Sequence, residues 1–215
     1  YNNDEKQKFT IGIEDDVTNL SLKLGPELVT TPEGTTNCKF WGLGADGTVG
    51  ANKNSIKIIG DNTDMYAQAY FDYDSKKSGG VTMSHLRFGH KKIKSTYLIR
   101  QANFVACHNP AYVRKYNMVQ ELVDGGTFLL NCAWTHEELD KHLPGQMKKY
   151  IADHNINFYT IDGVKIGIET GMGPTRINTI LQSAFFTLTG IIPAEKANEL
   201  MKAAAQATYG RKGQD

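Results

Sequence analysis

The sequence has no long apolar run, few cysteines and almost no net charge. No stretch approaches the roughly 18 consecutive apolar residues that a membrane-spanning helix needs, so we expect no membrane association. Lys and Arg number 24 against 23 Asp and Glu, so the basic excess typical of a nucleic-acid-binding domain is missing. These two deficits remove membranes and nucleic acids from the expected partners.

The three cysteines, Cys38, Cys107 and Cys132, form no C-x-x-C pair, and the six histidines show no H-E-x-x-H spacing. This argues against a disulfide framework and against an iron–sulfur or zinc site held by this chain, so we expect no metal ligand in it. Unpaired cysteines are typical of a reducing compartment, which predicts a cytoplasmic protein. The chain starts at Tyr1 without an apolar leader, which we interpret as a fragment of a longer polypeptide.

Residues 1–36 are polar and carry little periodicity, apart from a short strand expected at Thr10–Ile13 and a turn at Pro32–Gly34. We interpret them as a connecting arm. Residues 37–215 are predicted to form a single α/β domain, because strand and helix patterns alternate along them.

The expected strands cover 38–41, 65–73, 81–83, 104–107, 127–130 and 157–161. The expected helices cover 47–59, 112–123 (ended by Asp124-Gly125-Gly126), 135–155 with an interruption near Pro144, 174–189 and 193–209. This alternation predicts a three-layer α/β/α fold with a mostly parallel, Rossmann-like sheet. Ligands of such sheets bind beyond the carboxyl ends of the strands.

The strongest local signal is the glycine-rich run from Gly42 to Gly50, GLGADGTVG, between an expected strand and an expected helix. Its glycines allow a tight turn, and the N–H groups of the first helical turn then face an anion such as a phosphate. Gly42, Gly44 and Gly47 also match G-x-G-x-x-G, with the acid Asp72 further on, which is typical of an NAD site. The alternative is a tight turn that binds nothing.

Two further segments carry cations that could face the same anion. Arg176 is expected in the first turns of a helix, where a cation is unfavourable to the helix dipole and is better placed against an anionic ligand or an acidic partner. Lys76 and Lys77 precede Gly79-Gly80 and could close over a phosphate. The alternative in both cases is a solvated surface charge.

Other reactive side chains have simpler interpretations. If Ser84–Phe88 is a strand, Ser84 and Leu86 face one side and His85 and Arg87 the other, which favours a domain interface over catalysis. Cys107, His108 and Cys132 follow strands at the rim where ligands bind, but buried structural cysteines are the more common case. No residue is predicted to act as a catalytic acid, base or nucleophile.

Several stretches together resemble one family. They are the run GLGADGTVGANKNS from Gly42 to Ser55, SHLRFG from Ser84 to Gly89, CHNP from Cys107 to Pro110, GGTF from Gly125 to Phe128, and RIN from Arg176 to Asn178. They resemble the third, or gamma, domain of the pyruvate:ferredoxin/flavodoxin oxidoreductases, in the 2-oxoacid:ferredoxin oxidoreductase family. The resemblance covers about residues 9–213.

The resemblance implies an oxidoreductase that decarboxylates pyruvate on thiamine diphosphate and passes electrons through iron–sulfur clusters to ferredoxin or flavodoxin. The product is acetyl-coenzyme A, and the complete enzyme is expected to be a homodimer. In this family the domain resembling the chain contributes to binding coenzyme A. The residues carried over to that site are Gly44, Ala45, Asp46, Gly47, Thr48, Lys76, Lys77, Arg176 and Asn178.

The family's thiamine motif, Gly-Asp-Gly followed by paired asparagines, is not found in the sequence, and neither is a ferredoxin-like cysteine series. Thiamine diphosphate and the clusters are therefore expected on other domains of the enzyme, and the chain by itself is expected to be inactive. Two alternatives remain open. An autonomous NAD(P)-dependent oxidoreductase requires Asp72 at the end of the second parallel strand, near a ribose. A purely structural module requires Lys76, Lys77 and Arg176 to face a partner domain.

Overall fold

A computed structural model of the chain describes residues 7–14, 17–23, 25, 28–74, 79–94, 96 and 98–209. The chain divides into two units, Tyr1–Thr31 and Pro32–Asp215. In the first unit, the expected strand at Thr10–Ile13 is wrong, because Thr10 makes only an isolated bridge with Ser21. The bridge has two backbone hydrogen bonds of 3.1 Å, from Thr10 N–H to the Leu20 carbonyl and from Leu22 N–H to the Thr10 carbonyl.

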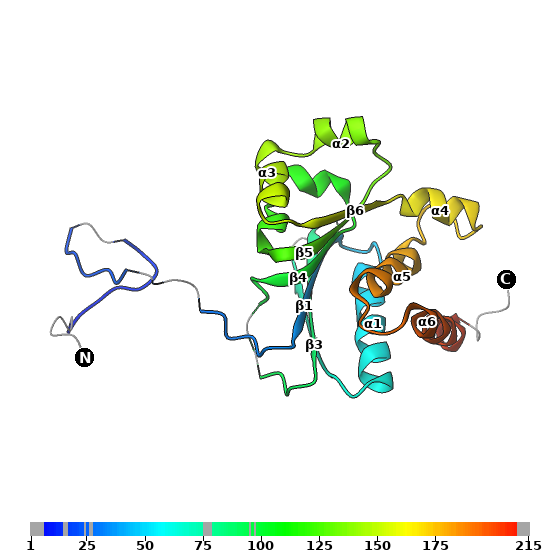
Figure 1. The fold of residues 1–215 in the computed structure, drawn as a ribbon, viewed down its shortest axis with the longest axis horizontal. Helices are drawn as coiled ribbons and strands as arrows, with labels where there is room; N and C mark the ends of the chain where they lie inside the picture. Colours follow the sequence, from blue (N-terminus) through cyan, green and yellow to red (C-terminus); the bar gives the residue numbers. More distant parts are fainter. Residues whose placement is uncertain are drawn as a thin grey trace. The chain divides into compact units, whose positions relative to one another are not determined.

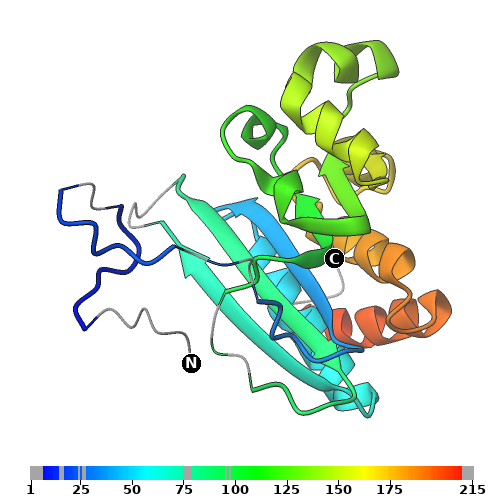
Figure 2. The ribbon, with the colours of Figure 1, turned by 60° about the vertical axis from the view of Figure 1, so that its left-hand side comes forward.

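The described residues of the second unit form a six-stranded sheet in the order β2-β3-β1-β4-β5-β6 (Figure 1). The strands are β1 (Thr36–Leu43), β2 (Tyr66–Tyr73), β3 (Val81–Gly89), β4 (Ala102–Cys107), β5 (Leu122–Asn131) and β6 (Asn157–Ile161). The pairs β1–β4, β4–β5 and β5–β6 are parallel, whereas β3 is antiparallel to both β1 and β2. The prediction of a mostly parallel α/β sheet is confirmed, and β3, which forms a hairpin with β2 (Figure 2), is the one antiparallel strand among the described strands.

Helices cover both faces of the sheet. The α-helices are α1 (Thr48–Asn62), α2 (His136–His142), α3 (Gly145–Asp153), α4 (Gly163–Glu169), α5 (Asn178–Thr189) and α6 (Ala194–Tyr209), with 3-10 helices η1 (Pro110–Arg114) and η2 (Met118–Glu121). Figure 1 shows α1, α5 and α6 on one side of the sheet and α3 on the other. The apolar side chains divide in the same way, since neighbouring residues on β1, such as Phe40 and Trp41, belong to opposite cores.

Aromatic packing fills the core under α1, α5 and α6. Phe185 of α5 lies at the centre, with its ring centroid 5.2 Å from that of Phe40, 5.4 Å from Phe104 and 5.1 Å from Phe186. Its side chain is almost fully buried. These contacts fix α5 over the middle of the sheet and so determine where the first residue of that helix lies.

The helix expected at 112–123 is wrong. The segment forms the short helices η1 and η2, and Leu122 already begins β5. Asp124-Gly125-Gly126, expected to end a helix, lies inside that strand. The helical spacing of apolar residues here reflects two short turns packed on the sheet, with Tyr112, Val113, Met118 and Val119 all buried. Because β5 pairs with strands on both sides, its ladder overrides the local helical pattern.

Most other elements agree with the predictions. The expected helix at 135–155 is present as α2 and α3, which meet at Pro144, and the predicted capping box joins Thr135 and Glu138. The strand expected at 157–161 is β6. Helix α5 begins at Asn178 rather than at Pro174, and α4 was not predicted. No helix in the described part of the chain is long and apolar enough to cross a membrane.

The core predicts a clear stability effect. Phe185→Ala should lower the free energy of unfolding by about 3–5 kcal/mol, because it leaves a cavity among packed rings. Thr187→Ala is the control, since Thr187 is exposed on the same helix and its loss should cost less than about 0.5 kcal/mol. Urea unfolding of the chain measures both changes, and equal effects would contradict the assignment of Phe185 to the core.

Candidate functional site

The glycine turn, which we define as Leu43–Thr48, leads from the end of β1 into α1. The turn places Gly47 at φ 85° and Ala45 at φ 73°, both in the left-handed region. The Asp46 N–H closes it by donating to the Leu43 carbonyl at 3.0 Å. The sequence analysis expected glycine at such positions, and Ala45 adopts the same backbone conformation with a side chain.

The Asp46 carboxylate occupies the start of α1. It accepts the N–H of Leu43 at 2.8 Å on one oxygen and the N–H of Thr48 at 2.7 Å on the other. A negative charge is favourable here because it faces the positive end of the helix dipole. The N–H of Thr48, the first residue of α1 and one of the groups expected to face a phosphate, is therefore already used by the turn's own side chain.

The turn meets the start of α5. The Asn178 side-chain amide donates to the Asp46 carbonyl at 2.6 Å. A Cβ at position 47 would lie 2.2 Å from Asn178 Nδ2, so only glycine leaves room for this contact. The structure thus brings together two segments that lie far apart in the sequence and that the sequence analysis assigned to one site.

Of the three cations expected at the site, the structure describes only Arg176. Arg176 is exposed in the loop just before α5, and it makes no hydrogen bond or ion pair to any residue in the described ranges. Arg176 lies two positions before Asn178 in the sequence. It is in a loop and not inside the helix that was expected to begin at Pro174. Lys76 and Lys77 lie outside the described residues.

A cavity of about 280 Å³ lies between the glycine turn and the adjoining ends of β2 and β3. The Gly44 N–H donates to the Gly80 carbonyl at 2.7 Å, which holds the β3 end of the hairpin against the turn. The lining includes two acidic residues, Asp46 and Asp74, and no cation from the described residues. Those described walls favour a neutral or hydroxyl-bearing group over a bare anion.

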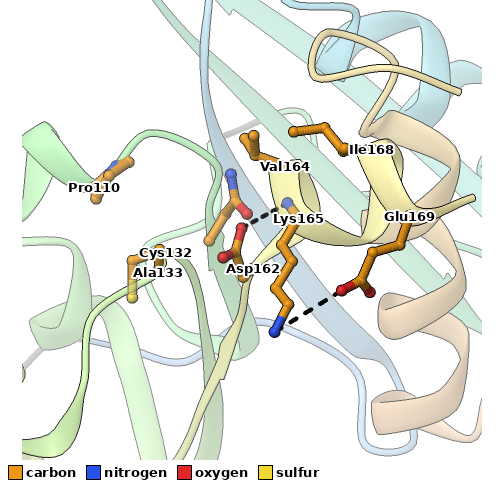
Figure 3. A pocket seen from close by; sticks show the side chains of 9 residues that line it. Pro110, Cys132, Ala133, Asp162, Val164, Lys165, Ile168 and Glu169 are labelled. Carbon is orange, nitrogen blue, oxygen red and sulfur yellow. Dashed lines mark hydrogen bonds and ion pairs between the residues drawn. The ribbon is translucent and has the colours of Figure 1, made fainter. Parts of the chain in front are cut away.

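A second cavity, of about 610 Å³, lies where β5 and β6 end (Figure 3). Residues of α4 form one wall, and Figure 3 shows Lys165 and Glu169 paired along it, with 3.9 Å between Nζ and Oε1. The Asp162 carboxylate accepts the Lys165 N–H at 2.9 Å and caps the helix. The lining residues are Pro110, Asn131, Cys132, Ala133, Asp162, Val164, Lys165, Ile168 and Glu169.

Both cavities lie at the edge where the parallel strands β1, β4, β5 and β6 end, which we call the carboxyl edge. The segments that leave β1 and β4 pack on opposite faces of the sheet, α1 on one and η1 with η2 on the other. Such a divergence between neighbouring strands is the usual position of a ligand site in α/β proteins. The glycine turn lies directly at it.

His108 follows β4 at this divergence and is the residue whose importance the sequence analysis missed. Its Nδ1 lies 2.7 Å from the Thr48 hydroxyl. Burial lowers the pKa of His108 from 6.5 to about 4, although the charge of Asp46 opposes this. The ring is therefore neutral at physiological pH. Its position between the expected strand and Pro110 was the available signal.

The cysteines agree with the structural interpretation. All three are free and buried. Burial raises the pKa of the Cys107 thiol to about 12, and it also raises the pKa values of Cys38 and Cys132. Thiols in this state are poor nucleophiles. Among the residues that the structure describes, no group of three or more His, Cys, Asp or Glu side chains is arranged to hold a metal ion.

Two other predictions concern β2 and β3. Asp72 lies on the edge strand β2, which β3 separates from β1, so the arrangement that an NAD site requires is not present. The predicted alternation on β3 is confirmed, because Leu86 packs in the core under α1 while His85 pairs with Lys39 on the other face. His85 is buried there and accepts the Ile99 N–H at 3.1 Å. It is not part of the carboxyl edge.

The sequence profile of the pyruvate ferredoxin/flavodoxin oxidoreductases matches residues 37–214. The chain belongs to this family. It is 58% identical over 208 residues to the pyruvate:ferredoxin oxidoreductase of Moorella thermoacetica and 59% identical over 207 residues to the pyruvate-flavodoxin oxidoreductase of Enterobacter agglomerans. These alignments cover 97% and 96% of the chain but only 18% of each relative. The chain thus corresponds to one part of much longer polypeptides.

Solved structures share the fold. The pyruvate oxidoreductase subunit PORC of Thermotoga maritima aligns with a TM-score of 0.61 at 17% identity, covering 78% of this chain and 83% of that subunit. A 2-oxoglutarate:ferredoxin oxidoreductase of Magnetococcus marinus, solved with 2-oxoglutarate, coenzyme A and succinyl-CoA, aligns with a TM-score of 0.61 at 13% identity. That match covers 85% of this chain and 28% of the other. At these identities, the likeness concerns the fold.

The Gly47–Asn178 contact predicts coupled stability effects. Gly47→Ala should cost about 2–3 kcal/mol, because it adds strain at positive φ and a clash with Asn178. In an Asn178→Ala background the clash is gone, so the same substitution should cost only about 1–2 kcal/mol. Urea unfolding of the four proteins of this cycle measures the difference, and additive effects would argue against the contact.

The buried histidines predict a pH dependence. Burial lowers the pKa of both His85 and His108 from 6.5 to about 4, so the unfolded chain binds more protons than the folded chain between these values. The contribution of these histidines to the free energy of unfolding should therefore be complete above about pH 6.5 and decrease as the pH drops toward 4. From pH 7 to pH 5 each ring should contribute about 1–2 kcal/mol of this loss. His108→Asn should show a shallower loss, and an unchanged slope would contradict the assignment.

Proposed function

We propose that this chain is the coenzyme A-binding gamma domain of a pyruvate (2-oxoacid):ferredoxin/flavodoxin oxidoreductase. The observation that carries the proposal is the meeting of the glycine turn with Asn178, and with Arg176 beside it, at the carboxyl edge of the sheet. Membership of the family supports it. The Magnetococcus marinus structure, which has the same fold, was solved with coenzyme A bound.

The charges in the two parts of the site favour different groups of coenzyme A. The Asp46 carboxylate already lies at the start of α1, so a phosphate there would meet a like charge. Arg176 is exposed nearby and free to make paired charge-assisted hydrogen bonds, which guanidinium groups form well with phosphates. We therefore place the phosphate groups of coenzyme A toward Arg176, with Lys76 and Lys77 as further phosphate ligands. The acidic cavity beside the turn suits the uncharged pantetheine arm, whose amide N–H and hydroxyl groups can donate to carboxylates.

The role of the domain is to position the ligand. Thiamine diphosphate, held by other domains, would carry the acyl group, and a coenzyme A thiol held in place by this domain would meet it in an effectively intramolecular encounter. No residue of the site is proposed as an acid, base or nucleophile. The three cysteines are buried and do not fit iron–sulfur ligands, so we assign the clusters to other domains of the enzyme. We assign thiamine diphosphate there as well, because the sequence lacks its Gly-Asp-Gly motif.

The partners follow from this role. Other domains of the same enzyme must bring the acyl intermediate to the carboxyl edge, since this domain would supply only the thiol. Ferredoxin or flavodoxin would accept the electrons from the complete enzyme, which we propose to be a homodimer. The domain by itself is then inactive but retains part of the coenzyme A site.

Arg176→Ala tests the proposal in the complete enzyme. It should raise the KM for coenzyme A by roughly tenfold or more, because one charge-assisted phosphate contact is worth about 1.5–3 kcal/mol. Cluster reduction by pyruvate without coenzyme A should be nearly unchanged, since that step does not use the thiol. Steady-state kinetics and single-turnover reduction measure the two effects.

Lys196→Ala is the matched control. Lys196 is an exposed cation of α6, which begins beyond the far end of α5 from Asn178. Because α5 has 12 residues, the two ends are about 18 Å apart. This variant should leave the KM for coenzyme A unchanged. A KM that is also unchanged in Arg176→Ala would remove Arg176 from the site.

A further inference from the structure

A chain of hydrogen bonds runs beneath the carboxyl edge and joins the segments that leave β1, β4, β5 and β6. The Thr48 hydroxyl lies 2.7 Å from Nδ1 of the His108 ring. The backbone N–H of His108 donates to the Trp41 carbonyl at 2.9 Å. The His108 carbonyl accepts the Asn131 amide at 3.0 Å. The Asn131 side-chain oxygen in turn accepts the Gly163 N–H, at the start of α4, at 3.0 Å. His108 thus lies in the middle of a chain from α1 to α4.

This chain of hydrogen bonds is shielded from solvent. The exposed fraction is 0% for Thr48, 8% for His108 and 7% for Asn131. Water cannot readily replace a partner lost at these positions, so each broken bond leaves a buried polar group unsatisfied. A distortion of one member is therefore passed to the next rather than absorbed by solvent.

Packing also fixes the hydroxyl of Thr48. A Cβ at Gly42 would lie 2.5 Å from Thr48 Oγ1, so the side chain fills the space that this glycine leaves. The Phe40 ring lies edge-on to His108 with 6.2 Å between ring centroids. Both partners of the hydrogen bond thus pack against residues of β1. A neutral imidazole offers one donor and one acceptor nitrogen, and it matches a hydroxyl without burying a charge.

We propose that His108 is a positioning residue of the coenzyme A site, an inference that rests on the function proposed above. Its ring holds Thr48 and thereby the start of α1, while Asn178 holds the opposite side of the glycine turn through the Asp46 carbonyl. Asn131 extends the same support to α4 and the larger cavity. His108 itself acts through Thr48.

The test uses coenzyme A binding to the complete enzyme, measured by titration calorimetry without a 2-oxoacid. His108→Leu and Thr48→Val each remove one partner of the hydrogen bond. His108→Asn and Thr48→Ser are the conservative variants, because the Asn amide stands near the position of Nδ1 and Ser keeps the hydroxyl. The double variant His108→Leu with Thr48→Val completes the cycle.

Each removal should weaken coenzyme A binding by roughly tenfold. The conservative variants should restore most of the affinity, and the double variant should bind no worse than either single one. In turnover, the KM for coenzyme A should rise while kcat at saturating coenzyme A stays nearly constant. A role in folding alone would lower the yield of active enzyme without changing the dissociation constant.

His85→Leu is the matched control, because His85 is as buried as His108 but bonds to Ile99 on the other face of the sheet. It should destabilise the protein without changing coenzyme A binding. If His108→Leu does not fold, the comparison of Thr48→Val with Thr48→Ser decides the question.

The outcomes separate the two proposals. Wild-type affinity in His108→Leu and Thr48→Val, with weakened binding in Arg176→Ala, would overturn the positioning role and leave the coenzyme A site intact. Wild-type affinity in Arg176→Ala and Asn178→Ala as well would overturn the site itself, and the positioning role with it.

Discussion

The two hydrogen bonds that the Asp46 carboxylate accepts from Leu43 and Thr48 are the interaction on which the carboxyl edge depends. They hold the turn between β1 and α1, and the bond from Thr48 satisfies one of the N–H groups that the helix leaves open at its start. With the turn fixed, the Asp46 carbonyl faces Asn178 and the Thr48 hydroxyl faces His108. Segments from both halves of the sequence thus converge on the glycine turn.

The same carboxylate changes how the glycine-rich segment is understood. In an empty glycine loop the N–H groups are available to an external phosphate. Here the Asp46 carboxylate accepts the N–H groups of Leu43 and Thr48, so the turn is ordered by its own side chain and carries a negative charge at its centre. In the coenzyme A site proposed here, the charge that binds phosphate must therefore come from elsewhere, and we assign it to Arg176 in the loop before α5. A preordered turn also lowers the entropy cost of binding.

Local signals predicted much of the fold and failed where long-range pairing decides the outcome. Thr135 and Glu138 form their capping box within four consecutive residues, so the sequence reveals it directly. Residues 112–123 have a helical spacing of apolar side chains, but Leu122 enters β5 because it pairs there with Ala102 of β4. No local pattern records which strands will be neighbours. For the same reason the position of β3 between β1 and β2, which separates Asp72 from the glycine turn, became visible only in the fold.

The sequence by itself determined the α/β class, the glycine turn and the family, because these depend on residue type and short spacing. The family resemblance also assigned the glycine turn, Arg176 and Asn178 to one proposed site, but only the tertiary structure decided which atoms of these segments meet. It placed Asn178 against Asp46, left Arg176 exposed beside them, and joined His108 to Thr48 through a buried contact. These pairs are distant in sequence, and their meeting depends on how α5 packs over the aromatic core and on the order of the strands. Packing geometry of that kind has no counterpart in the linear pattern.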